Sequence, residues 1–316
     1  MKSILALSMV VATTWAGSVH GPGLAARGRA PLDARTTQRL IKPGFSITFI
    51  DTFHGVPGTI PSSDNWIFDI GTSYPGGAER WGNHEYQSYT DSPDNVRLTH
   101  RDTLMISPRL KHGQWTSARI ETQRKDFVAA PGGKLFVESR LKVGDNPEAQ
   151  SKGIWPAFWA LGESFRGNFT NWPSASEWDF LEVLNGQNKI YSTIHCGTAP
   201  GGPCNEYNGI GNGGVPFTRG VWNTVGFQVD RTASGKGNGT WVDESLSWFL
   251  NGEKVLTVKG STVGDEPTWA KLAHEGHFLL FNVAVGGWWP GFPNDQTKDG
   301  TGAGLEVDYV GVWNSL

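Results

Sequence analysis

Short apolar runs separated by turn residues recur along the chain from Phe45 onward, and this pattern predicts the fold. The runs are rich in Val, Ile, Phe and Trp and are bounded by Gly, Pro, Asn and Asp, as is typical of strands between turns. One short segment, 267–273, indicates a helix. We expect strands at 46–51, 96–99, 104–108, 117–122, 134–143, 154–161, 178–184, 189–195, 222–230, 246–250, 254–258, 277–285 and 306–312. Many strands with hardly any helix predict an all-β jelly-roll sandwich.

The N-terminal part of the chain has a different pattern. Residues 1–20 combine a lysine, a short apolar run and then small residues, which predicts a secretory signal peptide. Residues 21–44 hold Gly, Ala, Pro and Arg without an apolar period, which predicts a disordered leader or propeptide. Residues 45–316 are uniform in composition and predict one domain. A second apolar run of membrane-spanning length is absent, so we expect a secreted, extracellular protein without a membrane partner.

Three acids stand within six residues at Glu177, Asp179 and Glu182, interleaved with Trp178, Phe180 and Leu181. On a regular strand Glu177 and Asp179 share one face, because side chains alternate. The third acid comes one place late. A single β-bulge between Asp179 and Glu182 would return it to the same face. The pattern therefore predicts a row of three acids on one side of a sheet.

Such a row suits glycosidic bond cleavage. Retaining glycosidases use two carboxyl groups about 5–5.5 Å apart, one on each side of the scissile bond. A middle Asp would hydrogen-bond one Glu and repel the other, which separates their pKa values. The spacing alone leaves open which Glu is the nucleophile. The alternative, an acidic strand face in solvent, is disfavoured by the aromatic residues between the acids.

The acidic segment 177–182 is similar to the bulged catalytic motif of glycoside hydrolase family sixteen, the laminarinase-type β-glucanases. Further segments resemble that family's landmarks in its order. They are WGNHEYQ at 81–87, TSARI at 116–120, GIWPAFW at 153–159, NVAVGG at 282–287 and VDYVGV at 307–312. The resemblance covers about 45–313. It implies a concanavalin-like β-jelly roll with a concave substrate cleft, and retaining endo-hydrolysis.

The resemblance also assigns roles to the acids. Glu177 would be the nucleophile, Asp179 its electrostatic assistant and Glu182 the general acid/base. The family usually has a small aliphatic residue after the nucleophile, whereas this chain has Trp178. Because Trp178 faces away from the acids, we expect it to pack in the core, and we expect a divergent branch of the family.

Aromatic side chains are the first candidates for sugar binding, because the apolar faces of sugar rings stack on them. Most of the 15 Trp residues are expected to pack in the core instead. For the cleft we favour Trp159 on its strand, Trp172 in the loop before the acids, and the pair Trp288 and Trp289 after a double glycine.

Polar candidates follow from their positions in the predicted strands. Asn83 and Glu85 are expected to share a strand face, where Glu85 would accept sugar hydroxyls. Arg119 would orient a carboxylate or a hydroxyl.

Two further polar residues have two interpretations each. His195, on the strand after the acids, either bonds to Glu177 or Asp179 or is structural. Asn282 lies among apolar residues in mid-strand and needs partners. Its partner is either a sugar hydroxyl or the backbone of a neighbouring strand.

The chain has two cysteines, Cys196 and Cys204, and they are close together in the sequence. We therefore expect a disulfide that constrains one loop. Asn168 and Asn238 begin N-x-Thr sequons and predict glycosylation.

Charge and metal-ligand content narrow the function further. The formal charge is −3, from 27 basic and 30 acidic residues, so no nucleic-acid partner is expected. Without a His-x-x-x-His pattern or a dense His/Cys set we expect no catalytic metal and no required cofactor. Many relatives in the resembled family carry a structural calcium with a ligand matching Asp308, so a structural calcium stays open.

Together these features predict a secreted, monomeric, retaining endo-glycosidase that hydrolyses β-1,3 or mixed 1,3/1,4 linkages of β-glucan. A β-1,3-galactanase and a transglycosylase on the same scaffold are the alternatives among enzymes. A lectin-like glycan-binding domain is disfavoured, because a pure binder needs neither outer Glu. The sequence leaves open glucan against galactan, hydrolysis against transfer, and the number of subsites.

Overall fold

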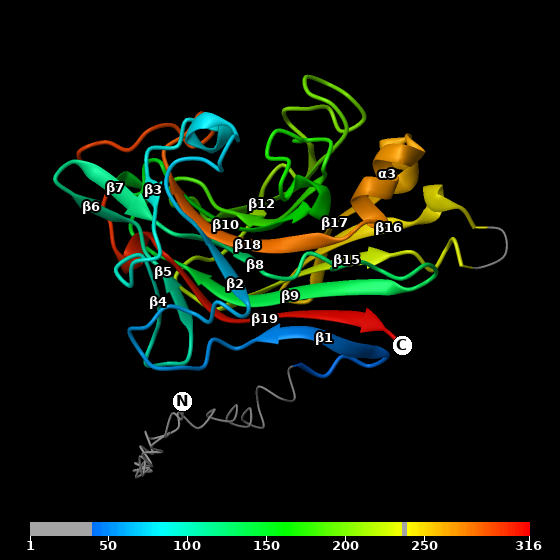
Figure 1. Cartoon of the computed structure of the whole chain (residues 1–316), viewed down its shortest axis with the longest axis horizontal. Coiled ribbons are helices and arrows are strands. Elements are labelled where there is room, and N and C mark those ends of the chain that lie inside the picture. Colours follow the sequence, from blue (N-terminus) through cyan, green and yellow to red (C-terminus); the bar gives the residue numbers. More distant parts are fainter. Residues whose placement is uncertain (1–39, 236–238) are drawn as a thin grey trace, which may run out of the picture. The chain divides into compact units, whose positions relative to one another are not determined.

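The computed structural model describes residues 40–235 and 239–316, which form a sandwich of two antiparallel sheets (Figure 1). The first sheet consists of β17 (Glu253–Lys259), β16 (Ser245–Leu250), β15 (Asn223–Asp230), β9 (Lys134–Val143), β19 (Leu305–Ser315), β5 (Leu104–Ile106) and β4 (Val96–Leu98), in that order, with β1 (Phe45–Asp51) beside β19.

The second sheet carries the acidic segment. It consists of β13 (Ile210–Gly211), β12 (Lys189–His195), β11 (Glu177–Glu182), β10 (Ile154–Gly162), β18 (His277–Val285), β8 (Arg119–Thr122) and β2 (Trp66–Asp69), in that order, with β14 (Val215–Pro216) beside β12. In Figure 1 the strands β10 and β18 lie in one layer and β9, β19 and β1 in the other. The all-β jelly-roll class predicted from the sequence is confirmed.

The smaller elements connect and flank the sheets. A three-stranded sheet contains β3 (Ser88–Tyr89), β7 (Gln114–Ser117) and β6 (Arg109–Lys111). The α-helices are α2 (Gly260–Val263) and α3 (Glu266–Ala273), and 3-10 turns lie at Glu79–Gly82, Glu148–Gln150, Glu163–Phe165, Trp241–Asp243 and Thr301–Ala303. Helix α3, predicted at 267–273, begins where the Asp265 carboxylate accepts from the backbone N–H of Thr268.

Strand prediction succeeded best for long apolar runs. The bounds of β9, β12 and β18 agree with the predicted segments. The segment predicted as one strand at 117–122 is two, because β7 ends at Ser117 and pairs with β3 and β6, whereas β8 begins at Arg119 and joins the second sheet. Short strands such as β2 and β6 were not predicted, since three or four residues give too little periodicity to detect.

The described body begins at Leu40, five residues before the predicted domain boundary. The Leu40 side chain is buried, its carbonyl accepts from Trp313 Nε1 at 2.9 Å, and Lys42 pairs with Glu138 at 2.9 Å. The predicted signal peptide and most of the predicted leader lie outside the described residues. The sequon residue Asn238 also lies outside them, whereas Asn168 is exposed in a loop.

The core fills the space between the two sheets and includes the residue that departs from the family pattern. Trp178 is buried, packs against Phe227 at a ring-centroid distance of 4.7 Å, and stacks on His277 at 3.4 Å. Its Nε1 donates to the carbonyl of Leu272 at the end of α3. The expectation that Trp178 packs in the core is therefore confirmed.

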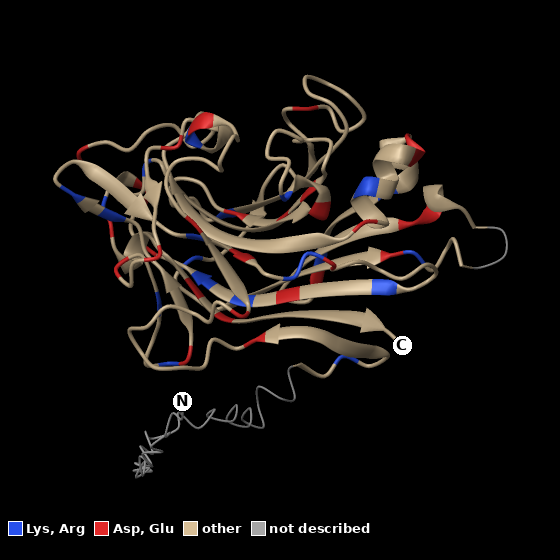
Figure 2. Cartoon of the chain, viewed as in Figure 1, with Lys and Arg blue, Asp and Glu red and all other residues tan. Residues whose placement is uncertain are grey.

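Charged residues of both signs are interspersed along the described chain (Figure 2). Among the described residues, no helix is both long and apolar enough to span a membrane.

The bulge in β11 depends on a contact from the opposite sheet, and this generates a prediction. Trp248 Nε1 of β16 donates to the carbonyl of Asp179 at 2.8 Å. We expect Trp248→Phe to lower the free energy of unfolding by about 1–3 kcal/mol, because it leaves that buried carbonyl without this donor. Denaturant unfolding measures the change. Trp288→Phe, at an indole that is 68% exposed, is the control and should stay within about 0.5 kcal/mol. Equal behaviour of the two variants would contradict the role given to Trp248.

Candidate active site

The three acids form a row because β11 contains the predicted bulge. Against β12, Asp179 pairs with Thr193 and Glu182 with Tyr191, so three steps along β11 match two along β12. The ladder with β10 shifts at the same place. Phe180 and Leu181 both enter the core at this point. Glu182 therefore returns to the face of Glu177 and Asp179, the face of the second sheet turned away from the first.

Each outer carboxylate has its own indole donor. Trp172 Nε1 donates to Glu177 Oε2 at 3.1 Å, from the loop that precedes β11. Trp155 Nε1 donates to Glu182 Oε1 at 3.0 Å, from the neighbouring strand β10. Trp172 was predicted to bind sugar, and here it also holds an acid. Trp155 was not selected, although its position two residues from Ala157 and four from Trp159 placed it on the same strand face.

Burial and neighbouring charges shift the pKa values of the three acids by different amounts. It raises the pKa of Glu182 to about 7, and the neighbouring charge of Glu177 adds to this shift. Burial also raises the pKa of Glu177, whereas the charge of His195 and the Trp172 bond lower it. The pKa of Asp179 lies well above its usual value because of burial and because of Glu177 and Glu182 on both sides. Near neutral pH the row therefore favours a protonated Asp179 between two carboxyls of different proton affinity.

His195 adjoins this row from β12. It is the cross-strand partner of Glu177, and its Nε2 lies 3.6 Å from Asp179 Oδ2. Its Nδ1 bonds to Glu206 Oε2 at 2.7 Å. Of the two partners expected from the sequence, Asp179 is the one whose carboxylate lies nearer to the His195 ring. The bond to Glu206 was not predicted. Glu206 lies in a loop without strand periodicity, so no sequence pattern marked it.

Trp159 is fixed by a chain of hydrogen bonds that crosses three segments. Its Nε1 donates to Asn282 Oδ1 at 2.8 Å, and Asn282 Nδ2 donates to the Tyr89 hydroxyl at 3.0 Å. The Tyr89 hydroxyl donates to Glu85 Oε2 at 3.0 Å. Of the two partners expected for Asn282, the backbone of a neighbouring strand is replaced by the Trp159 and Tyr89 side chains, whereas the sugar hydroxyl stays a prediction.

Asn83 and Glu85 do not share a strand face as predicted. They lie in a turn, because His84 between them has a φ of +59°. Glu85 is buried, and its carboxylate also accepts from Gln87 Nε2 at 2.5 Å and Asn83 Nδ2 at 3.5 Å. Glu85 therefore anchors the chain that ends at Trp159, with its oxygens already in use.

Arg119 is buried and does orient a carboxylate, that of Asp69. Its Nε donates to Asp69 Oδ2 at 2.9 Å, and the guanidinium lies 4.7 Å from the ring centroid of Trp159 and 4.6 Å from that of Trp81. Its Nη2 donates to the Tyr74 hydroxyl at 2.8 Å. Arg119, the cross-strand partner of Asn282, thus supports the Trp159 ring through its guanidinium.

The two late tryptophans are the most exposed aromatic candidates. Trp288 is 68% exposed and packs against His84, with ring centroids 4.4 Å apart. Trp289 is 49% exposed and makes edge contacts with Trp155 at 5.6 Å and Tyr191 at 5.3 Å. Trp289 therefore extends the aromatic surface that begins at Trp155, whose indole donates to Glu182.

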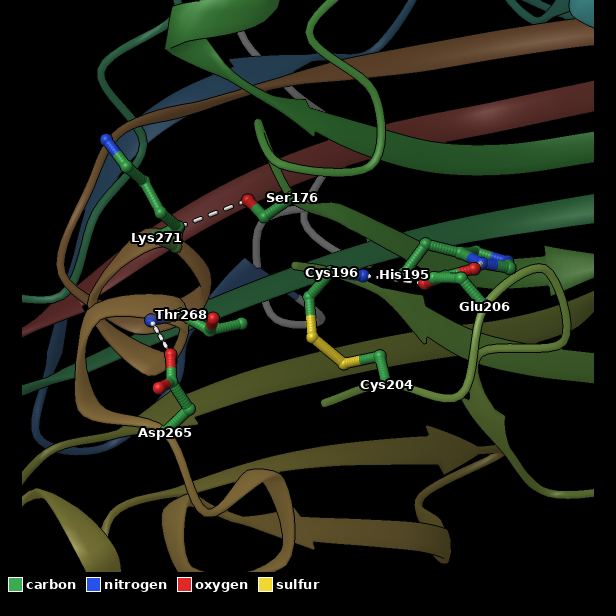
Figure 3. Close-up of a disulfide and its surroundings, with 8 residues drawn as sticks. All are labelled: Ser176, His195, Cys196, Cys204, Glu206, Asp265, Thr268 and Lys271. Atoms are coloured by element: carbon green, nitrogen blue, oxygen red, sulfur yellow. Dashed lines mark hydrogen bonds and ion pairs between the residues drawn. A yellow bond between two sulfur atoms is a disulfide. The ribbon is translucent and has the colours of Figure 1, made fainter. Parts of the chain in front are cut away.

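The predicted disulfide between Cys196 and Cys204 is present (Figure 3). Both cysteines are buried in the core cluster. The loop that they close begins directly after His195, so the disulfide constrains a segment beside the acidic row.

A structural calcium with Asp308 as a ligand, which the sequence leaves open, is disfavoured by the cation beside that carboxylate. The Asp308 carboxylate accepts from Arg140 Nη1 at 2.7 Å, so its charge is balanced by a cation. Within the described ranges, the one group of three or more acidic, His or Cys residues with metal-compatible spacing is Glu177, Asp179 and His195. We derive no step through a metal ion.

A cavity of about 610 Å³ lies elsewhere, among β4, β5, β9 and β19. Its lining includes Arg101, Lys142 and Glu306 and none of the predicted site residues. The predicted site residues therefore lie away from this cavity.

Two of the three similar proteins described next have names that state an action on β-1,3-glucan. The crystal structure of an endo-1,3-β-glucanase from Streptomyces sioyaensis is 42% identical, with 87% of this chain and 98% of that chain covered and a TM-score of 0.81. A glucan endo-1,3-β-glucosidase of Cryptopygus antarcticus is 27% identical over 267 residues, 79% of this chain and 87% of that protein. The clotting factor G alpha subunit of Tachypleus tridentatus is 27% identical over 277 residues, and the chain spans only 34% of its length. No family model matches the chain.

The raised pKa of Glu182 predicts a pH-dependent effect on stability. In the folded state the Glu182 carboxyl keeps its proton up to about pH 7. In the unfolded chain the same carboxyl has the usual pKa of 4.5 and has already released the proton at that pH. Stability from this proton is present below pH 4.5 and lost as the pH rises through 7. We expect Glu182→Gln to stabilise the fold at pH 8 by on the order of 2 kcal/mol and to have little effect at pH 4.

Urea unfolding at the two pH values measures this difference. The exposed Glu253→Gln is the control, and it should change stability by less than about 0.5 kcal/mol at both. A Glu182→Gln effect that is the same at pH 4 and pH 8 would show that burial does not hold the proton there.

Proposed function

The chain belongs to the endo-1,3-β-glucanases of the laminarinase type, and we propose that it cleaves internal β-1,3 linkages of β-glucan by a retaining double displacement on Glu177 and Glu182. It is a glycoside hydrolase. The family is supported by the 42% identity over nearly the whole of the Streptomyces enzyme. The mechanism is supported by the geometry and the electrostatics of the acidic row.

The observation that carries the mechanism is the bulged row with its two indole donors. Glu177 and Glu182 occupy the ends of one row, and each accepts from a different tryptophan. The two donors come from different segments, so the carboxylates are held separately rather than against each other. A retaining glycosidase requires two carboxyls on one face, one on each side of the scissile bond, and the ends of this row supply them.

In the first step the Glu177 carboxylate attacks the anomeric carbon while the Glu182 carboxyl gives its proton to the leaving glycosidic oxygen. The C–O bond to the leaving sugar breaks, and a covalent glycosyl-enzyme forms on Glu177. In the second step Glu182 accepts a proton from water, whose oxygen attacks the anomeric carbon and releases the sugar from Glu177. The pKa of Glu182, raised to about 7, suits a group that donates and then accepts a proton.

Asp179 assists without entering a covalent bond. Burial between Glu177 and Glu182 raises its pKa well above the usual value, and a hydrogen bond with Glu177 contributes to this. A protonated Asp179 donates to Glu177 and stabilises its negative charge. Because one outer Glu must be ionised and the other protonated, activity should follow a bell-shaped pH profile with its maximum on the acid side of neutrality.

Several properties complete this proposal beyond the family assignment. We infer that the enzyme acts outside the cell, which the predicted signal peptide and the Cys196–Cys204 disulfide support, and that it acts as a monomer. Mixed 1,3/1,4-glucan is a second proposed substrate. Cleavage of β-1,3-galactan and transfer of the glycosyl group to another glycan are the competing outcomes of the test below.

The test of substrate and reaction uses the full chain and a panel of polysaccharides. We expect laminarin to be cut to short oligosaccharides of several lengths, as internal cleavage requires, with lichenan cut more slowly. An acceptor oligosaccharide is added, and the products are analysed by mass spectrometry. Transfer lengthens this acceptor, whereas hydrolysis leaves it unchanged. Release of galactan fragments without laminarin cleavage would contradict the substrate assignment.

The division of labour between the two Glu residues predicts opposite stereochemistry on rescue. The substrate is an aryl β-glycoside of laminaribiose with a good leaving group. On it, Glu182→Ala should keep a residual turnover, which azide should raise with retention of the anomeric configuration. Glu177→Ala should be inactive, and azide should give the inverted product because it attacks from the vacant nucleophile side. NMR of the glycosyl azide measures the configuration. The opposite pair of anomers would reverse the assigned roles.

A further inference from the structure

Glu206 is a buried carboxylate beside the acidic row that the double displacement does not use. Its side chain is fully buried. Glu206 Oε1 accepts from the backbone N–H of Cys196 at 2.8 Å, and Oε2 bonds to His195 Nδ1 at 2.7 Å. Two oxygens with two different partners at the end of β12 fix both the position and the rotation of the carboxylate.

The disulfide loop brings Glu206 to this place. Cys204 is joined to Cys196, and Glu206 follows it by two residues. Within the loop, Gly201 and Glu206 exchange backbone hydrogen bonds in both directions. Figure 3 shows His195 and Glu206 side by side next to the disulfide. The covalent bond therefore returns the chain to the residue that precedes Cys196.

The chain also passes close to the imidazole just after Glu206. Gly209 has a φ of +70°, and a Cβ there would lie 3.0 Å from His195 Cε1 and 2.5 Å from the carbonyl oxygen of Ile194. A glycine is required for this approach. The loop thus passes close to the Cε1 edge of the His195 ring.

The other ring nitrogen of His195 faces the row. Nε2 lies 3.6 Å from Asp179 Oδ2, a buried oxygen that has no hydrogen-bond partner in the described part of the chain. Because a carboxylate accepts and does not donate, Glu206 selects the form of His195 with hydrogen on Nδ1. Nε2 is then the ring nitrogen that faces Asp179 Oδ2, and it carries a hydrogen towards that oxygen when His195 is protonated.

We propose that Glu206 is a positioning residue of the reaction, which acts through His195 to hold a proton beside Asp179 and so keeps Glu177 ionised for attack. The inference rests on the proposed function of the acidic row and adds a buried Glu–His pair to it. Neither Glu206 nor the disulfide touches the reacting atoms in this scheme. Their effect reaches Glu177 through the charge and orientation of His195.

The charges around His195 set the sign of the expected effect. Facing it are Glu177, Asp179 and Glu182 of β11 and Glu206 of the loop, with the Tyr207 phenol stacked on the adjacent Trp172. Burial lowers the pKa of His195, but the bond to Glu206 and the nearby acids raise it above its usual value. The His195 cation in turn lowers the pKa of Glu177. The Glu206 charge itself raises the pKa of Glu177, but by less than the His195 cation lowers it. Loss of the Glu206 charge should therefore lower the pKa of His195 and, as the larger effect of the His195 cation is lost, raise the pKa of Glu177.

The test is Glu206→Gln, which keeps the shape and removes the charge. We expect the acid limb of the kcat/KM profile on laminarin to move up by about one pH unit. KM at the optimum should stay within about twofold, because the change does not remove a sugar contact. Independently of activity, NMR of the ring nitrogens should show His195 titrating at lower pH in Glu206→Gln than in the unmodified chain.

Glu244→Gln is the matched control. Glu244 is also a buried carboxylate bonded to a histidine, His274, but it lies against α3 rather than the acidic row. This variant should lower the thermal midpoint without moving the acid limb or the His195 titration. A loss of stability in Glu206→Gln with an unmoved acid limb and an unmoved His195 titration would make Glu206 merely structural and overturn the inference.

A second variant tests the part played by the disulfide. Cys196→Ser with Cys204→Ser should shift the His195 titration in the same direction as Glu206→Gln, because Glu206 is no longer held by a closed loop. An unmoved titration in a folded double variant would remove the disulfide from the proposal. If laminarin were not cleaved by the unmodified chain, the proposed function would fail, while the NMR titrations would still decide whether Glu206 controls His195.

Discussion

The bulge between Asp179 and Glu182 is the constraint on which the site depends. A strand without it would point Leu181 at the substrate side and Glu182 into the core. The extra residue disrupts the ladder, and other donors serve the freed backbone carbonyls. Trp248 from the opposite sheet donates to the carbonyl of Asp179 at 2.8 Å, and the Ser192 hydroxyl donates to that of Phe180 at 3.0 Å. The core packing and the acidic row are therefore two results of one local irregularity.

The aromatic residues around the row, for which sugar binding is predicted, also hold the acids and one another in place. Trp155 and Trp172 donate to the outer carboxylates, and Trp159 is held by Asn282 and by the guanidinium of Arg119. An indole suits this position because it has one polar atom and a large apolar face. The same ring can fix a carboxylate through its edge and leave a face for a sugar. Preorganisation of the acids and of the substrate surface is thus shared by the same side chains.

The buried charges outside the acidic row are arranged in separate local groups. Arg119 balances Asp69, His195 is bonded to Glu206, and Glu244 is bonded to His274 and Arg231. The row of Glu177, Asp179 and Glu182 has no such cation of its own apart from His195 at its edge. Because unpaired buried carboxyls take up protons, the pKa values of this row rise while Glu244, with its partners, has a lowered pKa. Protonation chemistry near neutral pH follows from that difference.

The sequence determined the features that depend on neighbours along the chain. The alternation of Glu177, Asp179 and Glu182 with apolar residues predicted the strand, its bulge and the burial of Trp178, and the spacing of Cys196 and Cys204 predicted the disulfide. Only the tertiary structure decided the partners across strands and loops. Asn282 bonds to Trp159 and Tyr89, and Glu206 reaches His195 through a loop that has no periodic pattern. Side-chain alternation is a local property, whereas these contacts depend on which strands adjoin and on where a loop returns.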